Sequence, residues 1–440
     1  MKRIFFSLLL LLGCLTQLNA QVSAQRGELL TLEDAVKIAL ENNYDIRISR
    51  NELRIDETNT DIGNAGMLPK VTANIVDNNG IQNTSQTRSD GTVTSLNNAN
   101  NSSLNYGVGL DWTVFDGFRM FARYDQLKEL KKLGEAELKL TIITKISDVN
   151  ETYFDLVQQQ QQLAALDSTI VISNQRLALA QNRFTIGKAS KLEVLNAQVD
   201  LNTDTTTLLQ QQELYANTKV VLNQLLARDP KTDFKVIDAI PVDRTLQLET
   251  LSALAAKQNP QLQTQIINKN VAELQLKQVQ ATRYPTVKLN TGYNFADTRS
   301  SLGFTTQSSA NGLTYGFSAS MNLFDGFSQR RNEKVAKIAI ENASIGIEQQ
   351  NLALNSQLAT AYQTYKTNIK LVELEDKNED IARQNLDITL EKFRIGTITT
   401  FEFRTAQLNY VNAKVRNSNA QFEAKLSEIA LKELAGNLTF

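Results

Sequence analysis

The sequence contains two copies of one unit, and this duplication limits the possible folds more strongly than any other feature. The copies align with a period of about 210 residues. The matching segments are, in chain order, Leu32–Asn43 with Leu248–Asn259, Pro69 with Pro285, Val114–Phe118 with Leu323–Phe327, Tyr153 with Tyr362, Arg183–Gly187 with Lys392–Gly396, and Ala197–Gln198 with Ala406–Gln407. We therefore expect two similar halves, repeat 1 over 28–228 and repeat 2 over 245–437, joined by a proline-containing linker over 229–244.

Each copy is predicted to begin with a helix followed by a hairpin. The first helix is expected over 31–65 in repeat 1 and over 247–282 in repeat 2, and each ends before a proline, which cannot continue it. The hairpins follow over 70–115 and 286–324. Their closing loops are rich in Asn, Ser, Thr and Gly, as exposed loops usually are.

Two long helices are predicted to complete each copy. The segments 118–228 and 327–437 contain no proline, and Gly187 and Gly396 lie near their middles, where the chain can reverse. The tip turns are expected over 184–192 and 393–401. Each half of such a segment would form a helix about 60 to 100 Å long, a length typical of coiled assemblies.

The long helices have a narrow apolar stripe on an otherwise polar surface. In repeat 1 the stripe steps by three and four residues through Leu163, Leu166, Ile170, Ser173, Leu177, Ala180 and Phe184. The rest of the surface is polar and includes the run Gln158–Gln162. This pattern suits a helix that holds neighbours at its sides while water lies on its other faces. An ordinary antiparallel coiled coil would give the same pattern.

The hairpins have a different periodicity. Apolar and polar residues alternate from Leu104 to Val114 and from Leu313 to Leu323, close to the length that a tilted strand needs to cross a membrane. Aromatic residues that would suit an interfacial belt lie near the strand ends, at Phe115, Tyr293, Phe295 and Phe324. A soluble sheet with one buried face alternates in the same way. Here, however, the apolar faces have no obvious cover, because the helices use their apolar stripes on one another.

Four membrane strands per chain cannot close a lipid-exposed sheet wide enough for transport, and open edges are forbidden in hydrocarbon. Other copies of the chain must therefore satisfy the strand edges. The sequence thus predicts an obligate oligomer that shares one barrel. No apolar run after the N-terminal segment approaches the roughly 20 residues of a membrane-spanning helix.

The first 20 residues resemble an export signal. Lys2 and Arg3 precede the apolar run Ile4–Leu12, and the stretch ending at Ala20 provides a small-residue cleavage site. A second interpretation uses Leu11–Cys14 as a lipobox, which would leave an acylated Cys14. Both processing routes remain open.

Composition excludes several classes of function. With 46 Lys+Arg against 47 Asp+Glu, the chain lacks the basic surplus of a nucleic-acid-binding protein. It has no histidine, so Ser-His-Asp catalysis and His-containing zinc sites are excluded, and its single cysteine lies in the export segment. We expect no enzyme activity, no cofactor and no metal site.

The duplicated plan, the repeated Phe-Asp-Gly at the strand-to-helix junctions and the segments Arg183–Gly187 and Leu192–Gln198 together resemble the TolC family of outer-membrane factors. The resemblance covers nearly the whole chain after the export segment. It implies a mainly α fold with a membrane part, in which a homotrimer forms a 12-stranded β-barrel and an α-helical tunnel across the periplasm. The function implied is that of a passive outer-membrane exit duct for efflux or type I secretion, which docks with a periplasmic adaptor and an inner-membrane RND or ABC transporter.

The resemblance also implies site residues. Gly187 and Gly396, with Phe184 and Phe393, match the adaptor-docking tip. The carboxylates of Glu193 and Glu402 match the level of the closed aperture, where three copies would place six of them together. Two positions depart from the family pattern, because Ile398 and Thr405 stand where relatives often carry an arginine or a further acid. The alternatives are a turn glycine without a partner and a solvated acid at a helix end.

Asp116 and Asp325 are interpreted as helix caps, followed by Gly117 and Gly326 at the exit from each hairpin. The competing hypothesis for the whole chain is a secreted or periplasmic coiled-coil scaffold or adhesin without channel activity. That hypothesis explains the export segment and the helices, but not the paired alternating hairpins.

Overall fold

The computed structural model describes residues 28–302 and 305–438. The expected export segment, with Cys14 and the site after Ala20, lies outside the described residues. The chain forms two compact units. Of the described residues, a helical unit contains 28–48, 139–259 and 352–438, and a sheet unit contains the described part of 49–138 and 260–351.

The duplication is visible in the helix lengths. The long helices α4 (Arg119–Thr185) and α8 (Ser328–Arg394) each have 67 residues, and the returning helices α5 (Lys191–Leu225) and α9 (Thr400–Leu434) each have 35. These helices dominate the chain, so the predicted mainly α fold class with a sheet part is confirmed. No helix within the described ranges is both long enough and apolar enough to cross a membrane.

The first helix of each repeat is interrupted, so the prediction of one continuous helix is wrong. Repeat 1 has α2 (Leu32–Asn42) and α3 (Tyr44–Asn59), and repeat 2 has α6 (Leu248–Gln258) and α7 (Pro260–Ala281). In repeat 1 the side chain of Asn43 caps the start of α3. Its Oδ1 accepts hydrogen bonds from the backbone N–H groups of Asp45 and Ile46. In repeat 2 the break falls at Asn259, directly before a proline at the first position of α7.

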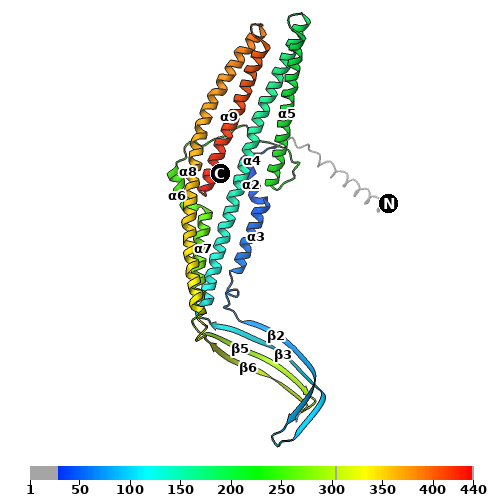
Figure 1. The fold of residues 1–440 in the computed structure, drawn as a ribbon, viewed down its shortest axis with the longest axis vertical. Coiled ribbons are helices and arrows are strands. Elements are labelled where there is room, and N and C mark those ends of the chain that lie inside the picture. The colour runs from blue at the N-terminus through cyan, green and yellow to red at the C-terminus, as the bar shows by residue number, and fades with distance from the viewer. Residues whose placement is uncertain (1–27, 303–304, 439–440) are drawn as a thin grey trace, which may run out of the picture. The chain divides into compact units, whose positions relative to one another are not determined.

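The sheet unit contains one antiparallel sheet in the order β2-β3-β5-β6 (Figure 1). Its strands are β2 (Lys70–Thr87), β3 (Val93–Phe115), β5 (Thr286–Ser300) and β6 (Gln307–Ser320). The repeats meet where β3 pairs with β5, for example Tyr106 opposite Phe295. The edge strands β2 and β6 each have one partner in the described chain, and apolar residues along them, such as Ile75, Tyr315 and Phe317, are exposed.

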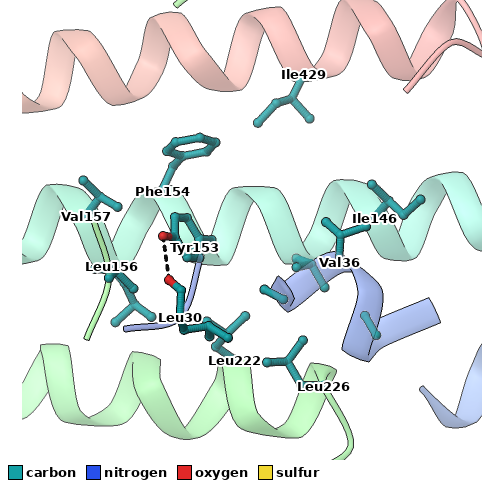
Figure 2. Packing of buried hydrophobic residues seen from close by; sticks show 14 of the residues in the cluster. Leu30, Val36, Ile146, Tyr153, Phe154, Leu156, Val157, Leu222, Leu226 and Ile429 are labelled. Carbon is teal, nitrogen blue, oxygen red and sulfur yellow. Dashed lines mark hydrogen bonds between the residues drawn. The ribbon is translucent and has the colours of Figure 1, made fainter. Parts of the chain in front are cut away.

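The main apolar core lies in the helical unit (Figure 2). Tyr153 and Phe154 of α4 pack there with Leu222 of α5, with Leu226 directly after α5, and with Ile429 of α9. The buried hydroxyl of Tyr153 donates to the carbonyl oxygen of Leu30 at 2.9 Å and accepts from the backbone N–H of Ile237 at 3.3 Å. It therefore ties the chain before α2 to the linker, beside the short parallel pair of β1 (Glu28–Leu29) and β4 (Phe234–Lys235).

The glutamine run of α4, expected to be wet surface, connects helices instead. Gln159 is 3% exposed and donates to the hydroxyl of Thr218 on α5. Gln158 and Gln162 both donate to the side-chain oxygen of Asn419 on α9. These contacts satisfy the amide donors that packing removes from water, whereas the buried Oε1 of Gln159 has no hydrogen-bond partner among the described residues.

The buried stripe of α4 also differs from the predicted one. Leu166, Ser173 and Ala180 are buried as expected, whereas Ile170 and Leu177 are only half-buried. Thr169 and Arg176 are buried in their place, because polar and small side chains of α4 face α5 and α9 in this region.

Candidate functional site

The turns that end α4 and α8 have the same backbone conformation. Gly187 has φ +72° and Gly396 has φ +81°, a left-handed conformation in which a Cβ atom causes strain. The Gly187 N–H donates to the carbonyl of Phe184 at 3.0 Å, and the Gly396 N–H donates to that of Phe393 at 3.1 Å. Both glycines therefore end a helix, as the tip interpretation requires.

The two phenylalanines beside these turns have different surroundings. Phe184 is 45% exposed, whereas Phe393 is 2% exposed and its ring stacks on Phe403 at 4.8 Å. The guanidinium group of Arg183 lies 5.0 Å from the Phe393 ring centroid and donates to the Phe393 carbonyl at 2.8 Å. Phe393 thus holds the second turn against the first and offers no surface to a partner, which corrects its expected place in a docking surface.

The two candidate aperture carboxylates start helices in the described chain. Glu193 Oε1 accepts a 2.6 Å hydrogen bond from the hydroxyl of Thr400, so it links the start of α5 to that of α9. Glu402 forms a capping box with Thr399, because its carboxylate accepts from the Thr399 N–H at 2.8 Å while the Thr399 hydroxyl accepts from the Glu402 N–H. The hydrogen bonds from Thr399 lower the pKa of Glu402.

Sequence reasoning missed a buried ionic network beneath these turns. Arg404 on α9 donates to both carboxylate oxygens of Asp204 on α5, at 2.7 and 2.8 Å. Asp204 also accepts from the hydroxyl of Ser173 on α4 at 2.6 Å, and the fully buried Arg176 pairs with Asp200. The network joins the two repeats within one chain.

A signal for this network exists in the sequence. Asp200 and Asp204 are four residues apart and share one face of α5. Arg176 falls on the stripe of α4 that also contains Ser173 and Ala180. A pocket of about 510 Å³ between the starts of α5 and α9 is lined by Arg176, Asp200 and Arg404, among others. Within the described residues, no group of three or more acidic, Cys or His side chains is arranged to hold a metal ion.

The helical unit leaves two helices at its outer sides. Hydrogen bonds connect α8 to α9 through Glu379 and Asn417, α9 to α4 through Gln407 and Ser173, and α4 to α5 through Gln159 and Thr218. The remaining faces of α5 and α8 carry exposed apolar residues at heptad-like spacing. They are Leu192, Leu195, Val199, Leu209 and Val220 on α5, and Leu371, Leu374, Ile381 and Ile388 on α8, with Ile395 directly after it.

Comparison with known proteins identifies the family. Residues 35–228 and 251–437 match the family described as "Outer membrane efflux protein". The chain is 20% identical over 409 residues to the outer membrane efflux protein BepC of Brucella suis biovar 1 (strain 1330), covering 93% of this chain and 86% of BepC. It is 20% identical over 304 residues to the outer membrane protein TolC of Escherichia coli (strain K12), covering 67% of this chain and 62% of TolC.

Solved structures have the same fold. The outer-membrane channel OprN superposes with a TM-score of 0.76 at 20% identity, covering 92% of this chain and 90% of OprN. The CmeC outer membrane channel of Campylobacter jejuni superposes with a TM-score of 0.75 at 17% identity, covering 92% of this chain and 85% of CmeC. The family match extends over most of the chain, and this protein therefore belongs to the TolC-related outer membrane efflux proteins and is located in the outer membrane.

Proposed function

We propose that this outer-membrane exit duct is a passive homotrimer, with a shared β-barrel and a periplasmic helical tunnel. Its partners are a periplasmic adaptor and an inner-membrane RND or ABC transporter, in a tripartite efflux or type I secretion system. The observation that carries the proposal is that, within residues 28–302 and 305–438, both edges of the sheet and the outer faces of α5 and α8 have no partner. The sequence contains no nucleotide-binding motif, so energy must come from the inner-membrane partner.

The strand order supports closure by identical copies. All neighbouring strands in the order β2-β3-β5-β6 are antiparallel, so the two edge strands run in opposite directions. β6 of one copy can therefore pair with β2 of the next and continue the antiparallel pattern. Such a ring has no free edge, which is the condition for a sheet in hydrocarbon.

The helices support the same arrangement. The exposed apolar stripes belong to α5 and α8, the two end helices of the hydrogen-bonded order α8-α9-α4-α5. Contact between α5 of one copy and α8 of the next would bury both stripes by coiled-coil packing. One head-to-tail contact, repeated around a closed ring, would thus cover the edges of the sheet and of the helices together.

The experiment is to purify the protein from outer membranes in detergent, determine its mass by native mass spectrometry and measure conductance in planar bilayers. A trimer with stable single-channel conductance is the expected result. A water-soluble monomer without conductance would refute the duct and favour the scaffold or adhesin.

The adaptor-docking tip comprises Gly187, Gly396 and Phe184 in this proposal, and Phe393 supports it from below. Both glycines lie in turns, and neither has backbone close to the position of an added Cβ atom. Leucine at both glycines should block export in cells and leave the trimer intact. Export at the wild-type rate would contradict the docking role.

The aperture proposal places Glu193 and Glu402 of three copies around the closed end of the tunnel. Clustered carboxylates attract cations, so divalent ions should reduce conductance. Glu193→Gln/Glu402→Gln is the suitable variant, because glutamine can keep the capping hydrogen bonds while it removes the charge. Equal cation block in the wild type and this variant would rule out the ring.

A further inference from the structure

The junction between β6 and α8 combines exposed aromatic rings with an unusual density of positive charge. Phe324 and Phe327 lie in the turn that leaves the sheet, and both are exposed, with their rings in edge contact at 5.4 Å. The helix that follows carries Arg330, Arg331, Lys334 and Lys337 within its first turns, and all four side chains are exposed. We call these four residues the basic patch. The junction lies entirely within the sheet unit.

The basic patch makes no direct ion pair in the described chain, although, beside the hydrogen bonds from Arg283, the charge of Lys337 contributes to lowering the pKa of the nearby Glu333. The acid within this stretch, Glu333, is buried and is bound by Arg283 and Gln329 instead. Three of the cations, Arg330, Lys334 and Lys337, are spaced by four and three residues and therefore share one helix face.

Helix stability does not explain these cations. The start of a helix carries a partial positive charge, so basic side chains there are unfavourable and acidic ones favourable. The helices α2, α5, α6 and α9 follow this rule with an acid in the first turn, whereas α4, α7 and α8 have none, and α8 has two arginines there instead. The first N–H groups of α8 are not left for a ligand either, because the Asp325 carboxylate accepts from the N–H of Gln329 at 2.7 Å.

The repeat provides an internal comparison. At the positions in α4 that correspond to the basic patch, the chain has Phe121, Ala122, Asp125 and Lys128. Only one of these is a cation, and Lys128 is paired with Asp125 at 3.1 Å. Arg119 and Arg123 also place exposed cations in the first turns of α4, so both junctions are basic. The basic patch of repeat 2 is the denser of the two clusters.

We infer that the basic patch binds the headgroups of anionic phospholipids at the periplasmic surface of the outer membrane. The inference rests on the proposed function, which places the exposed sheet in the bilayer and the helices in the periplasm. Along repeat 2 the exposed surface changes from apolar, at Tyr315 and Phe317, to aromatic at the junction, and then to basic on α8. This order matches the successive layers of a bilayer, which are the hydrocarbon core, the interface and the headgroups. The positive charge of the basic patch is complementary to the negative charge of headgroup phosphates. A soluble polyanion would account for the basic residues on α8 but not for the apolar and aromatic surfaces before them.

The test uses the purified full-length protein in nanodiscs of phosphatidylcholine with and without phosphatidylglycerol. Native mass spectrometry counts the lipids retained on wild type and on Arg330→Gln/Arg331→Gln/Lys334→Gln/Lys337→Gln. The wild type should retain phosphatidylglycerol in preference to phosphatidylcholine, and the variant should bind phosphatidylglycerol about tenfold or more weakly. Raising the salt concentration should remove the preference, because the cations are exposed.

Two further variants control the result. Exchange of arginine and lysine at the same four positions keeps the charge and should keep the preference. Glutamine at Lys366, Lys370, Lys377 and Arg383, exposed cations farther along α8, should also leave it unchanged. The inference is wrong if the wild type shows no preference, or if the first glutamine variant retains it. Conductance of the same protein preparations in planar bilayers distinguishes failure of the lipid-binding inference from failure of the proposed channel function. A conducting channel without lipid preference would contradict lipid binding by the basic patch and leave the channel function intact.

Discussion

The two tip turns of this protein have almost the same backbone and different environments. Both end a helix of 67 residues with a glycine and start a helix of 35. In repeat 1 the phenylalanine beside the glycine is exposed and the carboxylate of Glu193 reaches across to Thr400. In repeat 2 the equivalent phenylalanine is buried, and the carboxylate of Glu402 accepts its hydrogen bonds from Thr399 in the capping box of α9. The difference shows that the two repeats share the conformation of the turn, whereas matching side chains differ in burial and in hydrogen-bond partners because they pack against different neighbours.

The largest expected effect is the contrast between the two phenylalanines. Phe393→Ala removes a buried ring that stacks on Phe403 and should lower the local free energy of opening by about 3 to 5 kcal/mol. Phe184→Ala removes a half-exposed ring and should cost less than about 1 kcal/mol. Native-state hydrogen exchange around both turns measures the two values. Equal losses of opening free energy would show that Phe184 and Phe393 stabilise their turns to the same extent.

The second prediction concerns the connection between the repeats. Asp204→Ala removes the carboxylate that binds Arg404 through both oxygens and leaves this largely buried guanidinium with the more distant Asp200 at 3.9 Å. The loss should cost about 3 kcal/mol. Because the pair joins α5 and α9, faster hydrogen exchange should appear in both helices. Asp204→Leu combined with Arg404→Met removes both charges and should recover much of the loss. Faster exchange confined to α5 would mean that the stability of α9 does not depend on its ion pair with α5.

The third prediction tests what the turns have in common. Alanine at Gly187 or at Gly396 should cost about 1 kcal/mol in either turn, because the strain comes from positive φ. Asparagine, which tolerates this conformation better, should cost less. Thermal unfolding of the two alanine variants provides the measurement. A much larger loss at one glycine would indicate contacts that this structure does not contain.

The smallest effect is a pH dependence at the start of α9. The pKa of Glu402 is lowered from 4.5 by its hydrogen bonds with Thr399, so the capping box is favourable when the carboxylate is ionised. Its contribution is complete above pH 4.5 and is lost as the pH falls through the lowered folded-state value. Hydrogen exchange at the start of α9 should therefore accelerate with acid in the wild type and change less in Glu402→Gln. An identical acid response in both proteins would exclude the capping carboxylate as its cause.

Local patterns in the sequence identified features that depend on local geometry. The turn glycines and the capping aspartates were anticipated because a left-handed turn and a helix start each favour few residue types. The Asp116 and Asp325 carboxylates do accept hydrogen bonds from the N–H groups of Met120 and Gln329. The break before Pro260 was also visible in principle, because proline favours the first position of a helix.

Features that depend on neighbouring helices were missed. The glutamines of α4 look like solvent-facing residues in the sequence, and only the positions of Thr218 and Asn419 on other helices turn them into contacts. The same limit applies to Phe184 and Phe393. Their sequence surroundings are nearly identical, and the stacking of Phe403 on one of them decides which becomes buried.

The asparagines at the helix breaks have a consequence for how this chain can change in length. The side-chain amide of Asn43 donates to the carbonyl of Leu225 at the end of α5, and that of Asn259 donates to the carbonyl of Leu434 at the end of α9. Each returning helix is thus held at its far end as well as at its turn. One inserted residue would rotate everything beyond it by about 100° and shift it by about 1.5 Å, so one of the two attachments would be lost. A helical unit of a different length should therefore arise by whole heptads added to outgoing and returning helices together, and in both repeats at once.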